Sequence, residues 1–142
     1  MNVAAILSDK GATVHTIAPS VPVREAARML DEKGVGALVV VEGAVVCGVL
    51  SERDIAREVA RNGAEALDRP LSGAMTKDVV TAAPGDTLDQ LLSRMTSRRI
   101  RHLPVIVDGA LSGLVSIGDV VKWKIKEAED ENRAMRDYIT TG

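Results

Sequence analysis

Apolar residues recur along this chain with two spacings, one typical of an amphipathic helix and one typical of a buried strand. Apolar positions at i, i+3, i+4 and i+7 predict two helices, whose stripes are Val23, Ala26, Ala27 and Leu30, then Leu88, Leu91, Leu92 and Met95. After each helix, two apolar runs flank a Gly-containing turn, at residues 37–41 and 45–50, then 103–107 and 111–115. Because these runs contain few polar positions, we expect both faces of each strand pair to be covered.

Shorter segments extend each pattern to the order β-α-β-β-α. We expect a short strand before each amphipathic helix, at 14–18 and 79–83. A second helix is expected after each strand pair, from about Arg53 to Arg61 and from about Asp119 onward. Short entry turns are expected at Ile6-Leu7 and Ala74-Met75.

The two patterns are copies of each other. Residues 14–55 align with residues 79–120 without a gap, and the identical pairs are Val14/Val79, Thr16/Thr81, Ala18/Ala83, Pro19/Pro84, Leu38/Leu103, Val40/Val105, Gly48/Gly113, Ser51/Ser116 and Asp54/Asp119. A unit of about 60 residues buries little surface alone, so we expect two packed, pseudo-symmetric halves with related clefts between them. The predicted division is a first repeat at 1–63, a connecting segment at 64–78, a second repeat at 79–125 and a helical extension at 126–142.

Composition limits the classes of protein that fit. The 142 residues carry a net charge of −2, which predicts no general attraction to nucleic acid or membranes. The single cysteine, Cys47, excludes an intramolecular disulfide and is typical of a reducing compartment, so we expect a cytoplasmic protein. The apolar runs are far shorter than the roughly 18 residues that a membrane helix needs.

Each copy ends its second strand with Gly-x-x-Ser-x-x-Asp, at Gly48–Asp54 and Gly113–Asp119. The aspartate carboxylate can accept hydrogen bonds from the two adjacent hydroxyls of a ribose. The serine and the N-terminus of the following helix suit an anionic phosphate. The alternative is that Ser-x-x-Asp only caps the helix.

The paired unit resembles the CBS domain, named after cystathionine β-synthase, in these two endings and in the run Arg99-Ile-Arg-His102-Leu-Pro104-Val. The resemblance covers about residues 3–125. It implies an α/β (α+β) fold in which two pseudo-symmetric β-α-β-β-α CBS repeats form one module, here followed by a C-terminal helix. It also implies that the clefts bind an adenosyl ligand (AMP, ADP, ATP, NAD(H) or S-adenosylmethionine) and that two modules associate as a homodimer.

The resemblance implies two ligand sites, one for each aspartate. Site two is expected to contain Thr81, Ala82, Arg99, Arg101, His102, Ser116, Gly118 and Asp119. Site one is expected to contain Thr16, Ile17, Gly36, Ala37, Ser51, Arg53 and Asp54. Site two has the arginines, so we expect it to be the better phosphate site. In copy one, Ala37 and Val39 depart from the family's His and Pro.

These features favour a regulatory protein that senses adenine nucleotides and signals energy or redox state to an unidentified partner. One alternative is a constitutive dimerisation module with vestigial clefts. Another is nucleic-acid binding by residues 98–102, against which no aromatic residue is interleaved for base stacking. An enzyme is not favoured, because the spacing around Ser116 is not that of a nucleophile elbow and His15, His102 and Cys47 form no metal-ligand motif.

The C-terminal residues show a third spacing. Apolar positions and one asparagine follow each other at intervals of four and three residues, at Val121, Ile125, Ala128, Asn132, Met135 and Ile139. This is the seam of a short coiled coil, with a polar residue that sets its register. The alternative is a helix that lies across its own module.

Overall fold

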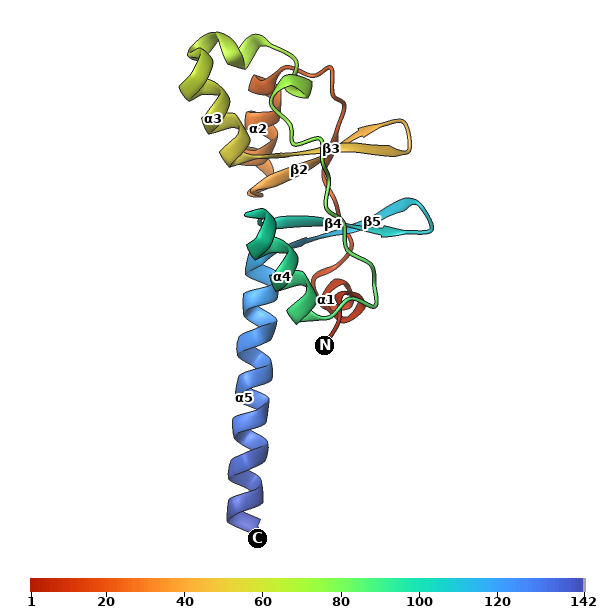
Figure 1. The fold of residues 1–142 in the computed structure, drawn as a ribbon, viewed down its shortest axis with the longest axis vertical. Helices are drawn as coiled ribbons and strands as arrows, with labels where there is room; N and C mark the ends of the chain where they lie inside the picture. Colours follow the sequence, from red (N-terminus) through yellow and green to blue (C-terminus); the bar gives the residue numbers. More distant parts are fainter. Residues whose placement is uncertain (142) are drawn as a thin grey trace.

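The computed structural model describes residues 1–141 and contains the two expected units (Figure 1). The first unit consists of β1 (Thr16–Ile17), α2 (Val23–Lys33), β2 (Ala37–Glu42), β3 (Val45–Ser51) and α3 (Glu52–Asn62). The second consists of α4 (Leu88–Arg98), β4 (His102–Val107), β5 (Ala110–Ser116) and α5 (Ile117–Thr141). An N-terminal helix, α1 (Val3–Lys10), precedes them, and two short 3-10 helices, η1 (Ala64–Asp68) and η2 (Leu71–Gly73), lie in the connecting segment.

The two sheets follow the repeat closely. In each unit the hairpin strands are antiparallel, and the register shifts at equivalent positions, after Val40 in one and after Val105 in the other. β1 pairs in parallel with β2. The prediction of a strand at 79–83 is wrong, because this segment makes one isolated parallel bridge, between Ala82 and Val105.

Local sequence explains where the amphipathic helices begin and end. Thr87 and Gln90 form the capping box at the start of α4, as their spacing predicts. Gly34 ends α2 with a left-handed backbone (φ 64°), and Arg99 takes the same conformation (φ 54°) at the equivalent place after α4. A left-handed arginine costs more than a left-handed glycine, so the second copy keeps this side chain at some expense in stability.

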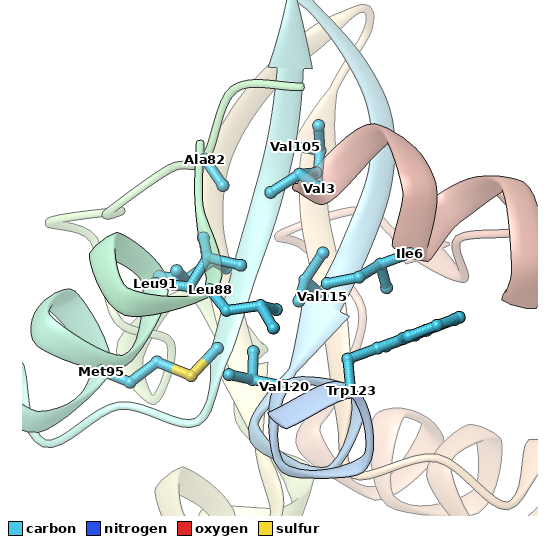
Figure 2. Close-up of a cluster of buried hydrophobic side chains, with 11 residues drawn as sticks. Val3, Ile6, Ala82, Leu88, Leu91, Met95, Val105, Val115, Val120 and Trp123 are labelled. Atoms are coloured by element: carbon cyan, nitrogen blue, oxygen red, sulfur yellow. The ribbon is translucent and has the colours of Figure 1, made fainter. Parts of the chain in front are cut away.

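The entry segments complete the core of the opposite repeat. Val3 and Ile6, from α1, are buried with α4, β4, β5 and the start of α5 (Figure 2). Leu71 and Ala74, which lie just before the second copy, are buried in the core of the first. The expected entry turn at Ile6-Leu7 is therefore part of a full helix. This exchange ties the two halves together, because neither core is completed by its own contiguous segment.

Helix α5 leaves the module instead of lying across it (Figure 1). Its first turns contribute the buried Val120 and Trp123 to the second core. Beyond Glu127, every residue up to Thr140 is exposed. The alternative of a helix packed along its own module is therefore wrong. No helix within residues 1–141 is long and apolar enough to cross a membrane.

Candidate functional site

The Ser-x-x-Asp motifs cap the helices that follow them, in both copies. The Ser51 side chain accepts a hydrogen bond from the backbone N–H of Asp54, and the Asp54 carboxylate accepts one from the backbone N–H of Ser51 at 2.9 Å. Ser116 and Asp119 make the same pair of contacts at 3.2 and 2.8 Å. The capping alternative is therefore confirmed as one role of these residues. A second role depends on what else each carboxylate meets.

Asp54 is buried, and its two oxygens have different partners. Oδ2 accepts two shorter hydrogen bonds from Ser51, from the backbone N–H at 2.9 Å and from the side-chain hydroxyl at 3.1 Å. Oδ1 accepts two long hydrogen bonds of 3.3 Å, from Arg57 Nη1 and from Thr76 Oγ1. Long hydrogen bonds are weaker than those near 2.9 Å. Oδ1 is therefore the oxygen on which a ligand hydroxyl can most easily replace a protein donor.

The two repeats meet at the first residues of β2 and β4. A Cβ atom added to Gly36 would lie 3.4 Å from His102 Nε2, so His102 reaches across to the opposite repeat. Equivalent backbone hydrogen bonds tie each strand start to its own helix start, from Glu52 N to Gly36 O and from Ile117 N to Arg101 O. Consequently the start of α3, with Ser51 and Asp54, faces the start of β4 from the other copy.

This junction forms a cleft of about 780 Å³, the open space at its mouth included. The cleft is lined by residues of both repeats and of the segment between them: Gly36, Val49, Ser51, Glu52, Arg53, Asp54, Arg57, Thr76, Asp78, Val79, Val80, Arg99, Ile100, Arg101 and His102.

The balance of charge in the cleft is positive. Arg53, Arg99 and Arg101 form no ion pair with any carboxylate of residues 1–141. These arginines also line a neighbouring hollow, which continues toward Ile117. Two of the three carboxylates in the cleft already have an ion-pair partner, since Arg57 pairs with Asp54 and Arg98 pairs with Asp78. The third, Glu52, makes no ion pair within the described chain. Unpaired arginines in a concave site suit an anionic ligand such as a phosphate.

Asp119 lies in a different environment. Lys10, the last residue of α1, places Nζ 2.7 Å from Asp119 Oδ2 and 2.9 Å from the carbonyl oxygen of Leu114. Burial raises the pKa of Asp119, but the hydrogen bonds from Lys10 and Ser116 outweigh it, so the pKa lies below its usual value. An ammonium group therefore contacts one oxygen, Oδ2, of the carboxylate that the sequence assigns to a ribose.

The structure regroups the residues expected in the two sites. Four residues of predicted site one line the cleft, namely Gly36, Ser51, Arg53 and Asp54. Arg99, Arg101 and His102, predicted beside Asp119, line this same cleft. That they also serve Asp119 stays a prediction, because His102 pairs with Ser116 between β4 and β5 and interacts with the charge of Asp119. Ser116, Gly118 and Asp119 do not line the cleft.

Five other residues of the two predicted sites, at positions 16, 17, 37, 81 and 82, do not line this cleft. β1, with Thr16 and Ile17, pairs with the middle of β2. Ala37 and Ala82 are buried, and the Thr81 carbonyl accepts a hydrogen bond from Arg94. The segment that leads into the second copy lines the cleft with Thr76, Asp78, Val79 and Val80. The missed signal was the position of this segment, which lies just before the second copy and therefore crosses the junction.

His102 gives the cleft a dependence on pH. Burial lowers the pKa of His102; Glu52 and Asp119 oppose this, and Lys10 and Arg101 add to it. The unfolded chain, with an ordinary histidine pKa near 6.5, binds the proton first as the pH falls. The free energy of unfolding is therefore expected to fall below pH 6.5, by about 1.4 kcal/mol for each unit that separates the two pKa values.

Urea unfolding of the ligand-free protein between pH 7.5 and 5.5 checks this expectation. In the His102→Gln variant the loss over this range should be smaller, because the titrating group is gone. Asp86 and Asp119, whose pKa values lie below the usual 3.8, stay ionised throughout this pH range and do not contribute to the change. Parallel pH profiles in the two proteins would contradict the assignment.

The sequence of this chain matches the model of the CBS domain family twice, at residues 6–61 and 71–126. The chain therefore belongs to the CBS domain family, as a tandem pair of CBS domains. It is 34% identical over 125 residues to the CBS domain-containing protein CBSX3, mitochondrial, of Arabidopsis thaliana. That match covers 84% of this chain and 61% of CBSX3, so the chain spans about three fifths of this relative.

Solved structures show the same fold. The CBS-domain containing protein ATU1752 from Agrobacterium tumefaciens is 44% identical, with a TM-score of 0.86 over 87% of this chain and 99% of that one. The CBS domain protein PAE2072 from Pyrobaculum aerophilum, complexed with AMP, is 28% identical, with a TM-score of 0.73 over 84% of this chain and 89% of that one. Some members of this fold thus hold an adenosine ligand.

Proposed function

We propose that this protein is a regulatory module that binds an adenosine-containing nucleotide in the cleft beside Asp54 and signals its occupancy to another protein. The observation that supports this best is the convergence of a buried carboxylate with three unpaired arginines at the junction of the repeats. Asp54 accepts hydrogen bonds from the ribose hydroxyls, and the arginines bind the phosphates. The complex of PAE2072 with AMP supports the ligand class.

The charge of the cleft favours AMP, ADP, ATP or NAD(H) over S-adenosylmethionine. A sulfonium cation would be repelled by Arg53, Arg99 and Arg101, whereas each phosphate is attracted. In this proposal Lys10 keeps a ribose hydroxyl from Asp119 Oδ2. We therefore infer one nucleotide per chain, in the cleft of Asp54.

The same reasoning supports a non-catalytic role, since the groups that line the cleft bind and neutralise a ligand without an activated nucleophile among them. We infer that the output is a change at the repeat junction, read by a partner that senses energy or redox state through this protein. The single cysteine supports a reducing compartment such as the cytoplasm. We also infer that two copies associate.

Calorimetric titration tests the proposal with AMP, ATP, NADH and S-adenosylmethionine. We expect binding of the phosphate-bearing ligands with a stoichiometry of one per chain, and none of S-adenosylmethionine at equal concentration. Heat from none of the four would favour a constitutive interaction module with empty clefts. Binding of RNA or DNA that is strongly salt-dependent and unaffected by AMP would favour the nucleic-acid alternative.

A further inference from the structure

The exposed part of α5 carries an apolar stripe. Ile125 is 55% exposed, Met135 64% and Ile139 73%, although these side chains follow one face of a single helix. Isolated apolar side chains on a surface are ordinary, but a continuous stripe on a projecting helix indicates an interaction surface. No element within residues 1–141 covers it.

The spacing of this stripe specifies the kind of partner. Ile125, Asn132 and Ile139 are seven residues apart and occupy the a positions of a heptad repeat. Ala128 and Met135 occupy the d positions between them. A single asparagine at an a position favours a parallel, two-stranded coil, in which it lies opposite its own copy. In an antiparallel pair an a residue faces a d residue, so Asn132 would meet an apolar side chain.

The flanking charges support the same arrangement. In a parallel coil, a g residue faces the e residue five positions later in the other helix. Lys124 and Glu131 are at g, and Glu129 and Arg136 are at e. Two copies in register therefore bring Lys124 opposite Glu129 and Glu131 opposite Arg136, and both contacts join opposite charges.

We propose that α5 pairs with α5 of a second copy of this chain as a parallel coiled coil, in register from Ile125 to Ile139. The proposal does not depend on nucleotide binding. Glu131 and Arg136 make no ion pair with another residue of the described chain, so they are available to each other across the coil. Lys124 already pairs with Asp89, at 2.7 Å, so the Glu131–Arg136 contact is the cleaner one to test.

Two substitutions of the same kind separate the seam from the outer face. Ala128 lies in the seam and Ala134 on the opposite side, and both are exposed in the single chain. We expect Ala128→Glu to weaken the dimer at least ~10-fold, because it places two like charges in an apolar contact. Ala134→Glu should leave the dissociation constant within about threefold. Sedimentation equilibrium measures both constants.

A charge exchange tests the direction of the helices. Glu131→Arg and Arg136→Glu should each weaken association about 2–10-fold, and the double variant should recover it, since exposed ion pairs contribute ~0.2–1 kcal/mol each. A wild-type protein that sediments as a monomer would overturn the proposal. So would a dimer that is insensitive to Ala128→Glu, or a double variant as weak as the single ones.

Discussion

Replacing Asp54 by alanine is expected to weaken AMP binding by about 100-fold, whereas Asp119→Ala should change it less than about threefold. Asp54 accepts the ribose hydrogen bonds in the proposed complex, and hydrogen bonds to a charged group contribute ~1.5–3 kcal/mol each. Asp119 lies outside the cleft and is already paired with Lys10. Calorimetric titration of AMP into the wild type and both variants measures the difference.

Asp54→Ala also removes the N3 carboxylate of the capping box at the start of α3, which is expected to lower stability. Asp119→Ala removes the equivalent cap from α5 and is therefore the matched control for this structural effect. Asp54→Asn provides a second control, because an asparagine keeps the cap but has no negative charge. If Asp119→Ala abolished binding and Asp54→Ala did not, the assignment of the nucleotide to the cleft at Asp54 would be wrong.

Replacing Lys10 by alanine is expected to open a second site and raise the stoichiometry for adenosine from one to two per chain. The substitution removes the ammonium that holds Asp119 Oδ2 and the carbonyl oxygen of Leu114. The two adjacent ribose hydroxyls can then donate one hydrogen bond to each of these oxygens. By the symmetry of the two repeats, the new site would have Gly34 and Gly36 where the cleft of Asp54 has Arg99 and Arg101. Without these arginines, the affinity for a phosphate-bearing ligand should be lower and less dependent on salt.

Two variants control this experiment. Lys10→Arg keeps the cation, so the stoichiometry should stay at one. Lys122→Ala removes a neighbouring lysine that pairs with Asp9 at 3.5 Å, and it should also leave one site. Without any ligand, the pKa of Asp119 should rise in Lys10→Ala, since the hydrogen bond that lowers it is lost. A rise in pKa with unchanged stoichiometry would show that Lys10 is not what closes the second site.

Local sequence was sufficient for most of the fold. Val23, Ala26 and Leu30 predict α2 because a helix brings positions three and four residues apart onto one face, and all three are buried. Thr87 and Gln90 predict the start of α4 for an equally local reason. The same local pattern predicts a short strand in both copies, yet residues 79–83 make one isolated bridge, because a weak pairing depends on neighbours outside the segment.

The candidate site was predicted less well. The motif located Ser51 and Asp54 and their helix start, because capping depends on residues three apart. It could not show that the arginines near residue 100 line one cleft with Asp54. Alignment of the copies groups residues by their position within a repeat, whereas the cleft groups residues that meet across the junction between repeats.

The sequence by itself determined the elements, the twofold repeat and the family, since periodicity, caps and turn residues act over a few positions along the chain. Only the tertiary structure decided which aspartate lines a cleft together with the arginines. Lys10 reaches Asp119 because α1 packs into the core of the second repeat, over a hundred positions away in the chain. Contacts at that separation depend on how two cores pack together, and no local pattern records them.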